Sequence, residues 1–154
     1  MKYRQVINYF KNLSEIHPNI KFFAFGDYDR ILGAERDNIS YPCMWLEVPN
    51  LSFKGENEVR SKVWNVAFVI LLNAQLDDTE TIEENIDTSE QICYDIISKI
   101  LYDHSQGTFL NVAISDVNMD LVYSKNSDND QGWRVELDIS VKSNIACDQT
   151  IWNP

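Results

Sequence analysis

Hydrophobic and polar residues alternate most regularly near the end of the chain. From 133 to 141 every second residue is apolar, namely Trp133, Val135, Leu137, Ile139 and Val141, and the residues between them are Arg134, Glu136, Asp138 and Ser140. Successive side chains of a β-strand point to opposite faces, so the pattern predicts a long strand with one buried and one polar face. Residues 116–123 alternate in the same way and predict its hairpin partner across the loop 124–132.

Two segments have the spacing of amphipathic helices. In 2–14 the apolar positions are Tyr3, Val6, Ile7, Phe10 and Leu13, and in 77–107 they are Ile82, Ile86, Cys93, Ile96, Ile97, Ile100 and Leu101. Pro18 ends the first helix, because the residue before a proline disfavours the helical conformation. Asp77, Asp78 or Thr79 can cap the second helix, where acidic residues crowd the first turns, and Gly107 is a suitable stop.

Three further strands are predicted at 20–25, 41–48 and 60–73. The second half of 60–73 is apolar on both faces, which is typical of a central strand, or of a strand covered by a helix on one side and a partner on the other. We predict a long polar connection at 26–40 and a loop at 50–60. The fold class is therefore α+β, a mainly antiparallel sheet with two α-helices packed on one face. A single domain would cover 1–148, followed by a C-terminal tail at 149–154.

The alternation also predicts what packs against what. Trp133, Val135, Leu137 and Ile139 would share a buried sheet face with Val117, Met119 and Leu121, packed against Ile86, Cys93, Ile97 and Ile100. A shift of one residue in the strand would place every one of these side chains on the other face, so the register can be tested directly.

Composition narrows the class of protein. The chain has 154 residues with 44% hydrophobic content, enough for one well-buried core, and its longest apolar run, 66–72, is far shorter than the roughly 20 residues that span a bilayer. Residues 1–12 lack the continuous apolar segment of a signal peptide. Three widely spaced cysteines, Cys43, Cys93 and Cys147, suit reduced thiols. These features favour a cytoplasmic location without membrane association.

The formal charge of −11, from 24 acidic and 13 basic residues, is unfavourable for gripping nucleic acid. An acidic surface usually serves solubility. A second interpretation is that it repels DNA, and so suits a passage through which DNA slides without sticking.

No motif of known chemistry stands out. The two histidines, His17 and His104, lack metal-spaced partners, and the usual zinc and nucleophile signatures are missing. The loop 127–132 resembles a calcium loop, but it places Ser127, Asn129 and Gln131 at the first three ligand positions, where no carboxylate falls. We therefore expect no catalytic residue, no cofactor and no metal. An enzyme would need an unfamiliar acidic site.

The order of elements, together with the segments 41–48, 61–74 and 132–148, resembles the tail-terminator and tail-completion proteins of tailed bacteriophages. The resemblance is one of pattern over residues 1–148. It implies a structural protein, from a phage, prophage or mobile element, that caps the tail tube and forms the head–tail joining ring. Its expected partners are further copies of the chain in a hexameric ring, tail-tube proteins and head-connector proteins. Its expected location is the cytoplasm during assembly and then the virion tail.

The candidate interface residues are Arg134, Glu136 and Asp138 on the polar strand face, and Ile151 and Trp152 in the tail. The polar face could equally be a plain solvent-facing side of the sheet, and the tail could fold onto its own core. Two other functions remain open, a different head–tail connector or neck protein, and a small cytoplasmic binding or regulatory domain without catalysis.

Overall fold

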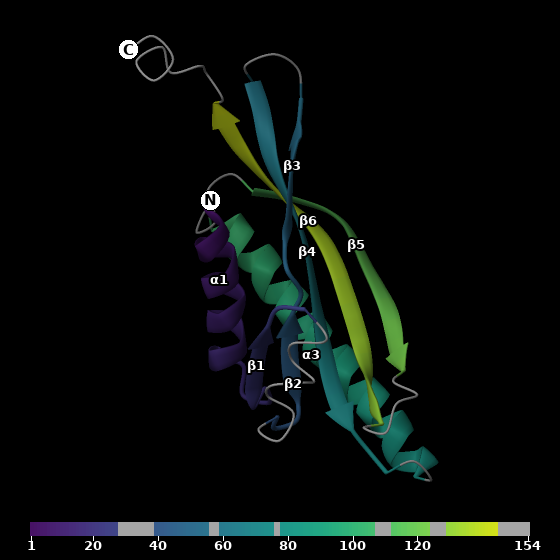
Figure 1. Ribbon diagram of the computed structural model, residues 1–154. Coiled ribbons are helices and arrows are strands. Elements are labelled where there is room, and N and C mark those ends of the chain that lie inside the picture. The colour runs from purple at the N-terminus through teal and green to yellow at the C-terminus, as the bar shows by residue number, and fades with distance from the viewer. Residues whose placement is uncertain (28–38, 56–58, 76–77, 107–111, 124–128, 145–154) are drawn as a thin grey trace.

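A computed structural model describes residues 1–27, 39–55, 59–75, 78–106, 112–123 and 129–144, and it contains two helices and six strands (Figure 1). In chain order these are α1 (Tyr3–Ile16), β1 (Phe22–Phe25), β2 (Cys43–Leu46), β3 (Asn50–Lys54), β4 (Val59–Asn73), α3 (Thr79–Ser105), β5 (Val112–Tyr123) and β6 (Asp130–Asn144). The predicted α+β class, with a mainly antiparallel sheet and two helices on one face, is confirmed.

The sheet has the order β1-β2-β4-β6-β5, and only the β1–β2 pair is parallel. The prediction of a central position for 60–73 is confirmed, because β4 lies between β2 and β6. Along one edge of β4, two short strands follow one another: β2 pairs with 68–71 and β3 pairs with 61–65. On the other edge β4 and β6 pair without interruption over 15 positions, from Val59–Asn144 to Asn73–Asp130.

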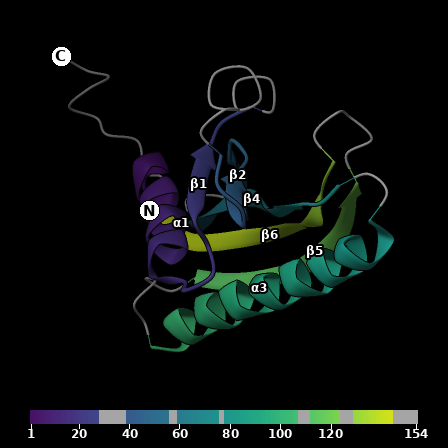
Figure 2. The same cartoon turned by 90° about the horizontal axis from the view of Figure 1, so that it is seen from below.

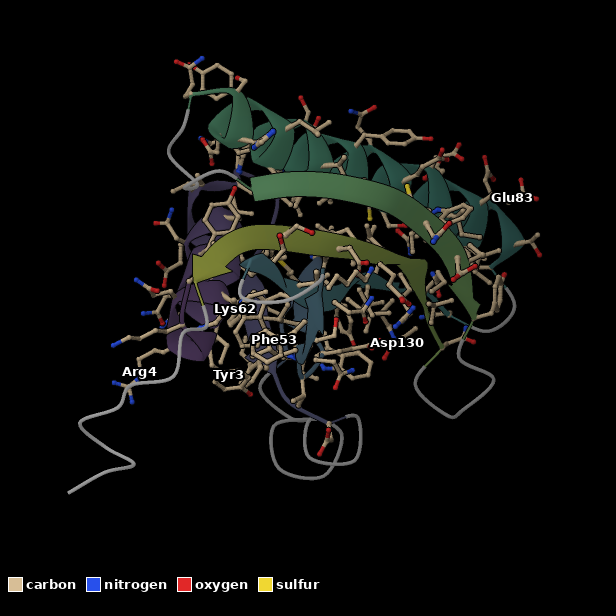
Figure 3. The ribbon with its side chains drawn as sticks, turned by 90° about the horizontal axis from the view of Figure 1, so that it is seen from above. Tyr3, Arg4, Phe53, Lys62, Glu83 and Asp130 are labelled. Carbon is tan, nitrogen blue, oxygen red and sulfur yellow. The ribbon has the colours of Figure 1, made fainter. Side chains whose placement is uncertain are left out.

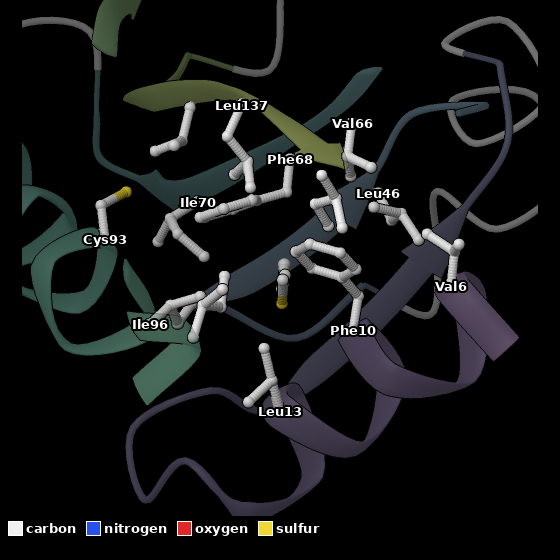
Figure 4. Close-up of a cluster of buried hydrophobic side chains, with 14 of the residues drawn as sticks. Val6, Phe10, Leu13, Leu46, Val66, Phe68, Ile70, Cys93, Ile96 and Leu137 are labelled. Carbon is white, nitrogen blue, oxygen red and sulfur yellow. The ribbon is translucent and has the colours of Figure 1, made fainter. Parts of the chain in front are cut away.

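Both helices bury their apolar sides on one face of the sheet (Figures 2 and 4). Helix α1 lies nearest β1 and β2, whereas α3 lies nearest β6, β4 and β5. Phe68 of β4 is buried at the centre, where its ring centroid is 5.8 Å from that of Phe10 in α1. The helices contribute Val6, Phe10, Leu13, Ile92, Cys93, Ile96 and Ile100 to this core.

The helices are also joined by polar contacts. The Tyr9 hydroxyl of α1 donates a hydrogen bond of 2.9 Å to Asp103 of α3, and Lys99 forms an ion pair with the same carboxylate. Burial and the nearby Asp103 carboxylate raise the pKa of Tyr9. At its start α3 is capped by Asp78, which accepts hydrogen bonds from the backbone N–H and the hydroxyl of Thr81. Asp78 was one of the three predicted caps.

The predicted packing of the last strand is confirmed in part. Val135, Leu137 and Ile139 are buried on the helix side, and Trp133 and Met119 pack against the same core. Cys93 and Ile100 are buried beneath them, while Ile86 and Ile97 are partly buried. Burial of Val117 and Leu121 was a wrong prediction: they are 38% and 48% exposed, because β5 is the last strand of the sheet and α3 covers it only along its inner side.

Other details also differ from the prediction. Residues 50–54, expected in a loop, form β3, whose five residues are all exposed. Strand β5 begins at Val112, four residues before the predicted start, and carries a bulge between Ser115 and Asn118. The predicted helix stripes were too broad, since Tyr3 and Leu101 are exposed, whereas Ile92 was missed and is buried. The predicted connection 26–40 falls mostly outside the described residues.

Candidate interaction surface

The sheet face opposite the helices, here called the far face, is lined with charged residues that bind one another. Arg134 of β6 donates two hydrogen bonds to Glu47, of 2.7 Å from Nε and 3.0 Å from Nη2, and one of 2.7 Å from Nη1 to Glu136. This bidentate contact, in which the planar guanidinium binds both oxygens of one carboxylate, is a strong arrangement for a charged pair. It ties β6 to the residue that follows β2.

The same network continues along the sheet to β3. Asn65 of β4 donates to Glu136 at 3.0 Å and to Asp138 at 3.2 Å, and the ammonium of Lys54 in β3 lies 3.0 Å from Asp138. We call the six residues Glu47, Lys54, Asn65, Arg134, Glu136 and Asp138 the far-face network. We predicted Arg134, Glu136 and Asp138 as interface residues. All three are partly buried and paired within the chain, and their contact with a partner stays a prediction.

The network lowers the pKa of two carboxylic acids. The pKa of Glu136 is lowered chiefly by its hydrogen bond with Arg134, and that of Asp138 chiefly by its hydrogen bond with Lys54. The pKa of Arg134 is raised, mainly by Glu47. A carboxylic acid with a lowered folded-state pKa adds stability above its unfolded pKa, and this stability is lost as pH falls through the folded-state value.

We expect Arg134→Met to destabilise the fold at about pH 7, because Glu47 and Glu136 would lose the partner that they share. The difference from the original chain should shrink as pH falls below the ordinary pKa of a glutamate, about 4.3, because protonation of Glu136 removes from the original chain a pair that the variant already lacks. Urea unfolding of both proteins across this pH range measures the difference in their free energies of unfolding. Lys11→Met is the control, since the Lys11–Glu15 pair of α1 is well exposed. Equal stability of the Arg134 variant and the original chain at neutral pH would contradict the prediction.

A second feature is an arm formed by β3, the first part of β4 and the last part of β6, which extends beyond both helices (Figure 1). Its helix-side face carries Leu51 and Phe53, which are 42% and 48% exposed. At the base of the arm, Tyr3 of α1 lies over Trp64, with their ring centroids 6.1 Å apart. Figure 3 shows Tyr3, Phe53 and Lys62 gathered on one side of the molecule, and Glu83 on the opposite side.

Charge is distributed unevenly along the chain. No lysine or arginine occurs from 63 to 98, a segment that contains Asp77, Asp78, Glu80, Glu83, Glu84, Asp87, Glu90 and Asp95. Most of the net charge of −11 therefore comes from one region, which includes the first half of α3. Glu80, Glu83, Glu84 and Asp87 are exposed there.

The described residues also form a small groove between the two helices. This groove, of about 190 Å³, lies between the end of α1 and α3, where His17 is 3.5 Å from Asp95. Small-molecule sites usually measure about 300–1,000 Å³. Across the described residues, no group of three or more His, Cys, Asp or Glu side chains is placed to hold a metal ion, and no helix there has the length and apolar content needed to cross a membrane.

The segment compared with a calcium loop ties other elements together. Asn129, whose φ of 54° lies in the left-handed region, donates a hydrogen bond of 3.0 Å to the Ala74 carbonyl. Asp130 accepts hydrogen bonds from Tyr41 and Asn73. Gln131 is buried at 1% exposure. Ser127 lies outside the described residues.

The structure describes two of the three cysteines. Cys43 and Cys93 are buried, and burial raises the pKa of the Cys93 thiol to about 12, which keeps it protonated. Cys147 lies outside the described residues, as do the tail residues Ile151 and Trp152 that we predicted as an interface arm.

The sequence-based search missed Glu47, Lys54 and Asn65 as members of the far-face network. The only available signal was alternation, which places Ser52 and Lys54 on one face of β3 and Leu51 and Phe53 on the other.

No protein-family model matches the sequence, and a search of curated proteins finds no match.

Proposed function

We propose that this chain is a phage structural protein, of the tail-terminator type, which assembles into a ring that caps the tail tube and joins it to the head. The observation that carries the proposal is the shape of the sheet. Helices cover one face, and the arm with Leu51 and Phe53 extends beyond them with apolar side chains exposed. Exposed apolar side chains gathered on a projecting element are typical of contacts with another protein.

The pattern of charge supports the same proposal. A subunit with a net charge of −11 repels the phosphates of DNA, so it suits a passage through which DNA moves without being bound. Among the described side chains of the far face, Arg134 and Lys54 are both paired with carboxylates of the same chain, which makes them less available to a phosphate backbone. A ring of these subunits would then guide DNA by repulsion, without a tight nucleic-acid site.

We expect the purified protein to form a closed ring, and the ring to be favoured by salt. Subunits of like charge repel one another, and raising the ionic strength from about 0.02 M to about 0.3 M shortens the Debye length from about 20 Å to about 6 Å. Light scattering after gel filtration should therefore show the mass of the assembly increasing with salt, and negative-stain images should show rings with a central opening.

Two results would contradict the proposal. The first is a strict monomer or dimer at high protein concentration over the whole salt range, which would favour a small binding or regulatory domain. The second is tight binding of duplex DNA at about 0.15 M salt, which would exclude a passage that repels phosphate.

A further inference from the structure

Within the described residues, the sheet has an edge strand on each side. In the described part of the chain β5 is the last strand on one side, and β3 lies outermost on the other side of β4 at the level of the arm. An unpaired strand presents a row of backbone N–H and C=O groups that can pair with another chain. β3 and the outer part of β5 also carry exposed apolar side chains, which natural proteins usually avoid on such edges.

The directions of the two strands make them suitable for each other. β3 is antiparallel to β4, β4 to β6, and β6 to β5, so β3 and β5 run in opposite directions. If successive copies keep the same orientation around an axis, β5 of one copy meets β3 of the next in the antiparallel arrangement. A contact between two different surfaces of identical chains closes into a ring when the rotation allows it.

The side chains of the two edges also match face by face. Leu51 and Phe53 are on the helix side of β3, opposite Trp64 and Lys62 of β4, and Leu121 is on the helix side of β5, opposite Trp133 of β6. Tyr123 lies two residues beyond Leu121 and so on the same face. Leu121 and Tyr123 are 48% and 51% exposed. On the far face, Lys54 of β3 is cationic and Asp120 of β5 is an exposed anion.

We propose that β3 of one copy pairs antiparallel with β5 of the next, so that one sheet continues from subunit to subunit around the ring. In this register Lys54 lies opposite Asp120, Phe53 opposite Leu121, Ser52 opposite Val122 and Leu51 opposite Tyr123. The register keeps apolar side chains on the helix side and places opposite charges across the junction, both of which stabilise cross-strand pairs. The inference rests on the ring of the proposed function and identifies its subunit contact.

Charge argues against the alternative of a two-fold dimer. The only charged residues of β5 are Asp116 and Asp120, and pairing β5 with a second β5 would bring like charges together. The only charged residue of β3 is Lys54, so β3 paired with itself has no opposite charge either. In the mixed pair Lys54, which pairs with Asp138 of its own chain but has a side chain 66% exposed, can also face the exposed Asp120 of the next copy.

Disulfide crosslinking between copies tests the pairing. Ser52→Cys with Val122→Cys, in a Cys147→Ser chain, would place two thiols at directly opposite positions, where Cα atoms lie about 4.5–5.5 Å apart. After oxidation of the protein assembled in salt, a denaturing gel without reductant should show a ladder of disulfide-linked copies. Two controls are matched to it: each cysteine alone, and Ser52→Cys with Asn118→Cys, which is four residues out of register and more than about 10 Å away. Neither control should give a ladder.

Each outcome is decisive. Rings that form without a ladder from the Ser52–Val122 pair, or with an equal ladder from the Ser52–Asn118 pair, would overturn the strand pairing and leave the proposed ring standing. Dimers linked by Val122→Cys alone would also overturn it, in favour of a two-fold contact. A ladder from open filaments without rings would support the pairing and contradict the proposed function, whereas no assembly at any salt concentration would remove both.

Discussion

Leu137→Ala is expected to lower the free energy of unfolding by about 2–5 kcal/mol, as large-to-small changes in well-packed cores do. Leu137 is 2% exposed, lies opposite Val66 in the pairing of β6 with β4, and faces α3 near Ile97 and Ile100. The substitution would leave a cavity between the sheet and the helix that the long strands cannot close by moving. Urea unfolding at constant pH and salt measures the loss.

The matched control is Leu121→Ala, the same change on the same face of the neighbouring strand. Leu121 is 48% exposed, so its loss should alter the unfolding free energy by less than about 1 kcal/mol. Similar losses for the two variants would show that β5 is covered as well as β6, and would contradict the packing described here.

Gly132→Ala should be destabilising by about 3 kcal/mol or more, the upper part of the range for overpacked sites. A Cβ atom added at Gly132 would lie 1.8 Å from the carbonyl oxygen of Ile70 and 2.9 Å from its carbon. Both atoms belong to the backbone of β4, so no side chain can rotate away, and the two strands must separate locally. The register pairs Gly132 with Leu71 on β4 and with Val122 on β5, so this separation would disturb three strands.

Alanine at this position also restricts the unfolded chain, an effect that would stabilise the fold by about 0.4–1 kcal/mol and so opposes the clash. Ser140→Ala, on the far face of the same strand, serves as the control and should have a small effect. Thermal and urea unfolding of the two variants measure the difference. A Gly132 variant as stable as the original chain would mean that the close approach of β4 and β6 at this point is wrong.

An element of this fold could be predicted from the sequence when its buried face leaves a regular hydrophobic pattern. The alternation from Trp133 to Val141 and the two-sided apolar run in β4 predicted a long strand and a central strand, because each pattern follows directly from which faces are covered. β3 was missed for the opposite reason. Only Leu51 and Phe53 of its five residues are apolar, so the alternation is too short to predict a strand, and its pairing with β4 supplies the structure.

The same reasoning explains the errors in burial and the part of the surface that was missed. The periodicity of Val117 and Leu121 indicates a strand, but it cannot show that the strand is the last of its sheet. The polar face of Arg134, Glu136 and Asp138 could be predicted by alternation. Their partners Glu47, Lys54 and Asn65 are far away in sequence, and only the strand register brings them together.

The interruptions of the two flanking strands lie at one level of the sheet, and this level divides the subunit into a helix-covered part and the arm. Val66 of β4 is paired with Leu137 of β6; β2 ends and β3 begins on one side of this pair, and the bulge of β5 lies on the other. Only the β4–β6 ribbon crosses that level without a break, and a two-stranded ribbon bends and twists more easily than a wide sheet. In the proposed ring β3 belongs to the arm of one copy and residues 120–123 of β5 to the helix-covered part of the next, so the contact would place each arm beside its neighbour's body and stagger the copies along the strands.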